Sequence, residues 1–177
     1  RLLEETVGAK FNIVLGYQGG GPIDLAVEKG EIHCRAMTIE SFFAREPFHT
    51  WRKNNFVKSI AQSPRKRDAR LPDTPTIYEL MDQYKTPEQA RRVATVILAG
   101  GVFGRPMVGP AGIPADRLKI LRSAFASALK DPELKVEAEK RSYELEPVGG
   151  DEMERLAKEV MAQPPEVIER MKRVLGN

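Results

Sequence analysis

Cysteine, histidine and tryptophan are scarce in this chain of 177 residues, which has one, two and one of them. The single cysteine, Cys34, cannot form an internal disulfide, and one cysteine with two histidines offers no recognisable zinc-ligand spacing. His33 and Cys34 are neighbours on an expected strand, where adjacent side chains point to opposite faces and cannot form a nucleophile–base dyad. We therefore expect no catalytic residue, no metal ligand and no enzymatic activity.

Long apolar runs are also missing. The stretch from Val93 to Gly104 holds far fewer than the roughly 20 apolar residues that a membrane-spanning helix needs. The first residues do not form the charged and apolar regions of a signal peptide. No membrane span is expected.

The chain has little excess of charge of one sign, since 28 Lys and Arg and 25 Asp and Glu give a formal net charge of +3. With 41% hydrophobic residues the chain has the composition of a soluble globular protein rather than a disordered one. The one basic cluster, residues 65–70, contains Asp68 and no aromatic residue for base stacking. We expect a solvated loop there and no nucleic-acid partner.

The order of hydrophobic patterns predicts an α/β fold with parallel strands. Strands are expected over residues 11–17, 31–35, 56–61, 102–108 and 143–147, with helices between and after them. Helix starts are marked by Thr76 with Glu79, by Thr86 with Gln89, and by Asp131 before Pro132.

A glycine-rich turn lies between the first expected strand and the next helix, in the segment Tyr17, Gln18, Gly19, Gly20, Gly21. Asp24 stands where a dinucleotide fingerprint has its third glycine, and no Gly-Lys-Ser/Thr follows, so we expect no nucleotide and no other cofactor. The turn has two interpretations. Its amides can bind a carboxylate at a helix N-terminus, or the glycines only satisfy positive φ in a plain turn.

Aromatic residues gather between Phe42 and Trp51, with Phe43 and Phe48 between them. This cluster has two interpretations as well: it lines a solute pocket, or it forms part of the hydrophobic core.

Several sequence phrases, taken in order, resemble the solute-binding receptors of tripartite tricarboxylate transporters, the Bug-type receptors. They are Gly16-Tyr17-Gln18-Gly19-Gly20, Glu28-Lys29-Gly30-Glu31, Leu71-Pro72-Asp73-Thr74-Pro75-Thr76, Gly109-Pro110-Ala111-Gly112-Ile113-Pro114, Leu129-Lys130-Asp131-Pro132-Glu133 and Pro164-Pro165-Glu166-Val167. One departure is His33, which stands where family members commonly carry Asp.

This resemblance implies a type II periplasmic-binding-protein-like fold and a periplasmic, non-enzymatic receptor for a small carboxylate, which it delivers to a membrane permease. It implies ligand contacts at eight residues: Tyr17, Gln18, Gly19, Gly20, Gly21, Arg35, Thr38 and Ser41.

The resemblance also divides the chain. Residues 1–101 correspond to the second lobe of such a receptor, and residues 102–177 to the C-terminal segment that returns to the first lobe. The sequence given has no counterpart of the first lobe, so apolar faces around residues 102–125 need another cover, and we expect self-association into a homo-oligomer. The alternative function is a structural or interaction protein that keeps half of the receptor fold and has no role in transport.

Overall fold

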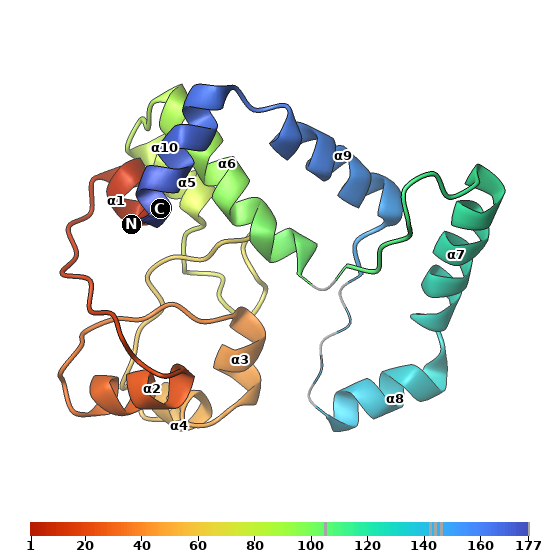
Figure 1. Ribbon diagram of the computed structural model, residues 1–177. Coiled ribbons are helices and arrows are strands. Elements are labelled where there is room, and N and C mark those ends of the chain that lie inside the picture. The colour runs from red at the N-terminus through yellow and green to blue at the C-terminus, as the bar shows by residue number, and fades with distance from the viewer. Residues whose placement is uncertain (105, 142, 144, 146, 177) are drawn as a thin grey trace. The chain divides into compact units, whose positions relative to one another are not determined.

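The computed structural model describes residues 1–104, 106–141, 143, 145 and 147–176. These described residues contain ten α-helices, which account for 56% of them (Figure 1). The helices are α1 (Leu2–Val7), α2 (Gly20–Glu28), α3 (Ile39–Ala44), α4 (Phe48–Lys53), α5 (Ile77–Gln83), α6 (Glu88–Phe103), α7 (Ala115–Ala128), α8 (Pro132–Lys140), α9 (Gly150–Met161) and α10 (Pro165–Leu175).

The α/β, type II periplasmic-binding-protein-like fold expected from the sequence is wrong. Within the described part of the chain there is no sheet, and the β structure is confined to one parallel bridge between Gln62 and Thr76. A strand is stable only when a neighbouring strand satisfies its backbone donors and acceptors, whereas a helix satisfies them within one segment. Alternating sequence patterns alone do not supply that neighbour.

The expected strands show how the patterns were misleading. Residues 11–17 have no regular structure, and Ile13 and Leu15 are 41% and 78% exposed, so their alternation marks no buried face. Val102 and Phe103, expected to open another strand, are instead the last two residues of α6, and the C-cap Gly104 has a φ of +46°. The expected edge strand over 143–147 includes residues outside the described part.

Two compact units make up the chain. The smaller unit is Lys10–Ser59, and the larger unit is Arg1–Ala9 together with Ile60–Asn177. The sequence boundary near residue 101 stays a prediction.

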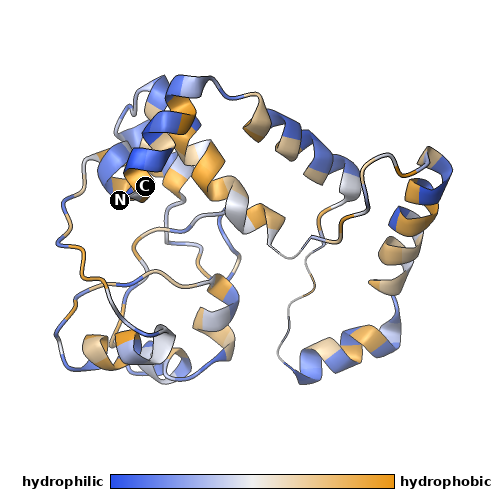
Figure 2. Cartoon of the chain, viewed as in Figure 1, coloured by the Kyte–Doolittle hydropathy of each residue, from blue (hydrophilic) through white to orange (hydrophobic). Residues whose placement is uncertain are grey.

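The core of the larger unit forms around α6. Ile77, Met81 and Ala94 are buried together, and Leu2 and Leu98 are among the partly buried residues that pack on them. Helix α6 contacts α1, α9 and α10, and apolar residues follow its length (Figure 2). Its long apolar stretch therefore serves as the central helix of this unit.

Two of the three helix caps predicted from the sequence are confirmed. Thr76 and Glu79 form a reciprocal capping box at α5, and the Asp131 carboxylate accepts the amides of Glu133 and Leu134 at α8. The third helix, α6, begins at Glu88 as its start signal predicted, but the expected capping box is wrong, because the N-cap is Pro87 and no side chain caps the helix. The Thr86 hydroxyl donates to the carbonyl of Thr6 instead.

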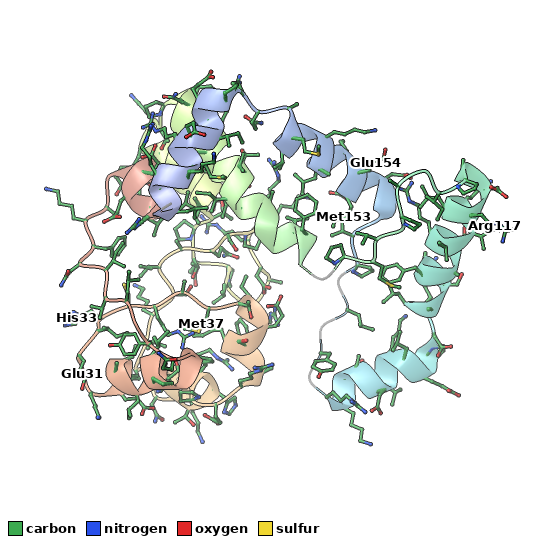
Figure 3. All side chains as sticks on the ribbon, in the orientation of Figure 1. Glu31, His33, Met37, Arg117, Met153 and Glu154 are labelled. Carbon is green, nitrogen blue, oxygen red and sulfur yellow. The ribbon has the colours of Figure 1, made fainter. Side chains whose placement is uncertain are left out.

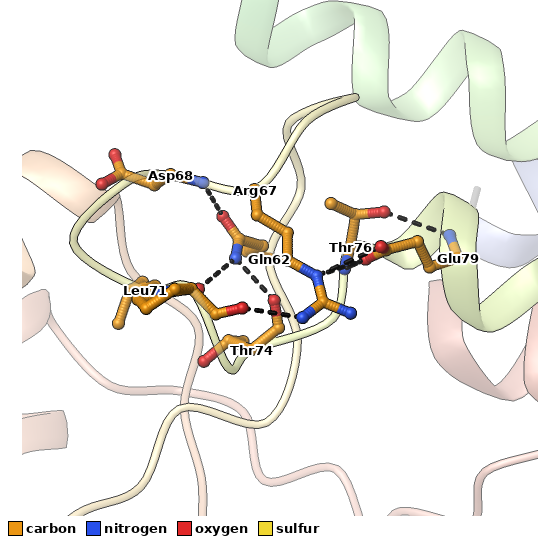
Figure 4. Close-up of polar contacts among 8 residues, drawn as sticks. Gln62, Arg67, Asp68, Leu71, Thr74, Thr76 and Glu79 are labelled. Carbon is orange, nitrogen blue, oxygen red and sulfur yellow. Dashed lines mark hydrogen bonds and ion pairs between the residues drawn. The ribbon is translucent and has the colours of Figure 1, made fainter.

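Gln62 organises the loop before α5 (Figure 4). Its Nε2 donates to the carbonyls of Leu71 and Thr74 at 3.0 and 2.7 Å, and its Oε1 accepts the amide of Asp68 at 2.7 Å. The side chain is buried with its hydrogen bonds satisfied, so it holds both ends of the loop in place.

Candidate functional site

The glycine-rich turn leads directly into α2. Gly19 has φ of +130°, a conformation that L side chains rarely adopt, and it is the N-cap without a side-chain cap. Among the described residues no acceptor bonds the amides of Gly20 or Gly21, and Pro22 has no amide proton. Two unbonded donors at the positive end of a helix are suited to a small anion.

Arg35 fixes the position of this turn. Its Nη1 donates to the carbonyl of Gly20 at 3.2 Å and forms an ion pair with Asp24, both side chains being 14% exposed. Its guanidinium carbon lies 5.3 Å from the centre of the Phe48 ring. Because Asp24 neutralises its charge, Arg35 acts mainly by holding the turn in position and adds little net positive potential.

Thr38 and Ser41 meet each other at the start of α3. The Thr38 hydroxyl oxygen accepts the amide of Ser41 at 3.2 Å, and its hydroxyl lies 3.0 Å from the hydroxyl of Ser41. This is an N-cap, so both side chains are already used by the helix. Of the eight residues expected to contact ligand, the structure joins Gly20 to Arg35 and Thr38 to Ser41. Tyr17 and Gln18 precede Gly19 in a segment without regular structure.

Phe48 and Trp51 of the aromatic cluster belong to the core, whereas Phe42 and Phe43 are only partly buried. Phe48 and Trp51 are 4% exposed each, and the ring centre of Trp51 lies 5.3 Å from Phe48 and 5.5 Å from Phe56. The indole N–H of Trp51 donates to Glu28 Oε1 at 3.0 Å and so ties α4 to the end of α2. Arg35, which contacts both the Phe48 ring and the Gly20 carbonyl, connects this core to the turn.

His33 and Cys34 are both exposed and lie in the segment after α2, where Figure 3 labels His33. Among the described residues, no three His, Cys, Asp or Glu side chains are placed together to hold a metal ion. In the same residues, no helix has both the length and the apolar character to cross a bilayer.

Sequence reasoning did not find a cavity of about 520 Å³ in the larger unit. Its lining comes from α5, α6, the end of α9 and the basic loop. The lining residues are Arg65, Tyr78, Met81, Glu88, Arg91, Arg92, Thr95, Glu159, Ala162 and Gln163. These residues are far apart in the sequence and share no motif, so only the packing of the helices brings them together.

Comparisons with protein-family models, with curated proteins and with solved structures found no match for the chain.

Proposed function

We propose that the protein is a non-enzymatic binding protein for a small carboxylate, with the turn before α2 as its binding element. The observation that carries the proposal is the pair of amides, of Gly20 and Gly21, that no acceptor in the described chain bonds. A carboxylate held by preoriented amides needs no titrating side chain. The sequence phrases that resemble carboxylate receptors support the same class of ligand.

In this proposal the protein serves a tripartite tricarboxylate transporter as its periplasmic receptor and passes the solute to the membrane permease. The transport role rests on the sequence resemblance alone, whereas carboxylate binding rests also on the geometry of the turn. The two parts need separate tests.

Calorimetric titration with succinate, citrate, glutamate and aspartate tests the binding. We expect saturable heat with at least one of them, and the absence of heat with all four contradicts the proposal. The site is tested with Gly21→Asp, because a Cβ at Gly21 meets nothing within 4 Å and the new carboxylate stands beside the free amides.

We expect Gly21→Asp to abolish carboxylate binding. The new aspartate carboxylate either accepts hydrogen bonds from the same amides or repels a carboxylate ligand from them. The matched variant Gly21→Asn adds a similar volume without the charge and should keep most of the affinity. Equal affinity of wild type and Gly21→Asp would show that solute binds elsewhere.

A second candidate function is an interaction protein that assembles through its own copies. It is favoured by α7, where Ile120, Leu121 and Phe125 are 61%, 56% and 42% exposed. Apolar residues so close together on one helix favour a partner that covers them. Light scattering at micromolar concentration tests it: a homo-oligomer that Leu121→Asp dissociates supports this function, and a monomer excludes it.

A further inference from the structure

Gln163 has a buried oxygen without a partner in the described chain. Its Nε2 donates to the carbonyl of Glu159 at 3.1 Å, whereas its Oε1 is buried and accepts no hydrogen bond from any described residue. Buried polar atoms are nearly always bonded, and each exception calls for an explanation. Since Gln163 lines the 520 Å³ cavity, a ligand in that cavity can supply the missing donor.

Two of the three arginines that line the cavity have carboxylate partners. Arg91 pairs with Asp82 at 2.6 Å and also donates to the carbonyls of Met81 and Thr86. Arg92 pairs with Glu88 at 3.2 Å. Because these arginines already have carboxylate partners, the cavity does not call for a strongly anionic ligand, in contrast to the turn before α2.

The other polar side chains that line the cavity include both hydrogen-bond donors and hydrogen-bond acceptors. The Arg65 guanidinium carbon lies 5.0 Å from the centre of the Tyr78 ring, and no described carboxylate forms an ion pair with it. Burial raises the pKa of Tyr78 by more than the positive charge of Arg65 lowers it, and the negative charge of Glu159 adds to the increase. The Tyr78 hydroxyl therefore stays protonated at neutral pH. Donors of Arg65 and Tyr78 thus share a cavity with acceptors of Glu159 and Gln163.

We propose that this cavity binds a neutral polyhydroxy compound of the saccharide class. A sugar hydroxyl donates one hydrogen bond and accepts others, so a single ring can donate to Gln163 Oε1 and accept from Arg65. The volume lies within the range of ligand pockets in proteins, and the exposed Ala162 offers apolar contact to the carbon face of a sugar ring. Neither the site nor the ligand class depends on the proposed carboxylate binding.

The test is calorimetric titration of the full chain with glucose, galactose, mannose and maltose. We expect saturable binding of at least one of them, and no binding of any overturns the proposal. In Gln163→Leu we expect affinity to fall about tenfold, because the accepting oxygen is removed. The matched control Gln83→Leu changes an exposed glutamine outside the cavity and should bind as wild type does.

Measuring the stability of the variants distinguishes a loss of sugar binding from a loss of folding. Replacing an unpartnered buried acceptor with an apolar side chain should leave the thermal midpoint of Gln163→Leu unchanged or higher. Tyr78→Phe keeps the ring, removes one hydroxyl and should weaken binding several-fold. Unchanged affinity in both variants overturns the assignment, as does competition of succinate with the sugar. Gly21→Asp should leave sugar affinity intact, so a failure here and a failure of carboxylate binding are distinguishable.

Discussion

At the scale of single residues, the Arg35–Asp24 ion pair controls the candidate carboxylate site. Both side chains are 14% exposed, and Arg35 also holds the carbonyl of Gly20. Removing one member of a nearly buried pair leaves the other charge unpaired, which costs more than removing both. The main contribution of the pair to stability is therefore that it leaves neither charge unpaired.

Arg35→Met should destabilise the smaller unit by about 1–3 kcal/mol, and Asp24→Asn with Arg35→Met should recover part of that loss. Carboxylate affinity should fall further in the single variant, since the unpaired Asp24 lies in the same helix as the free amides. Urea unfolding followed by the fluorescence of Trp51, the only tryptophan, measures the stability. Equal stability of single and double variants would contradict the coupling, and Arg45→Met is the control at an exposed arginine.

At the scale of elements, the start of α5 depends on Thr76 and Glu79. The Thr76 hydroxyl accepts the Glu79 amide at 3.1 Å, the Thr76 amide donates to Glu79 Oε2 at 2.7 Å, and Arg67 donates to the same carboxylate at 2.9 Å. Thr76→Val should cost about 1 kcal/mol because the cap is lost, whereas Thr76→Ser keeps the hydroxyl and most of the stability. Thermal unfolding followed by circular dichroism measures both.

The same cap predicts a dependence on pH. Hydrogen bonds from Arg67, and then from the Thr76 backbone, lower the pKa of Glu79 below its ordinary 4.5 in the folded protein. A carboxyl with a lowered pKa stabilises the fold above the ordinary value, and this contribution is lost as the pH falls through the folded pKa. Below pH 4.5 the midpoint of wild type should thus fall more steeply than that of Glu79→Gln. Parallel curves would contradict this, and Glu139→Gln on α8 controls for the charge change.

At the scale of elements, some features of the fold could be predicted from the sequence and others could not. The caps at Thr76 and Asp131 were predictable because a cap is a contact among residues two or three apart. The glycine turn before α2 was predictable for the same reason, as a local conformation. The strands were not, because pairing depends on a distant partner that alternation at 11–17 does not reveal. The cavity around Gln163 was not either, since its residues lie from 65 to 163.

At the scale of the whole molecule, the division into two units predicts two unfolding transitions. The smaller unit, Lys10–Ser59, has Phe48, Trp51 and Ala26 as its fully buried apolar residues, and the larger unit has the cluster around α6. A unit of about 50 residues buries a smaller fraction of its surface and is correspondingly less stable.

Trp51 lies in the smaller unit, whereas most of the helical residues, in α1 and α5 to α10, lie in the larger one. Trp51 fluorescence should therefore change at a lower urea concentration than the circular dichroism of the helices, because each signal reports a different unit. Met81→Ala, which opens a cavity in the core of the larger unit, should move the second transition by about 2–5 kcal/mol and leave the first in place. Coincident transitions, or a shift of the fluorescence midpoint in Met81→Ala, would show instead that the two units unfold as one cooperative structure.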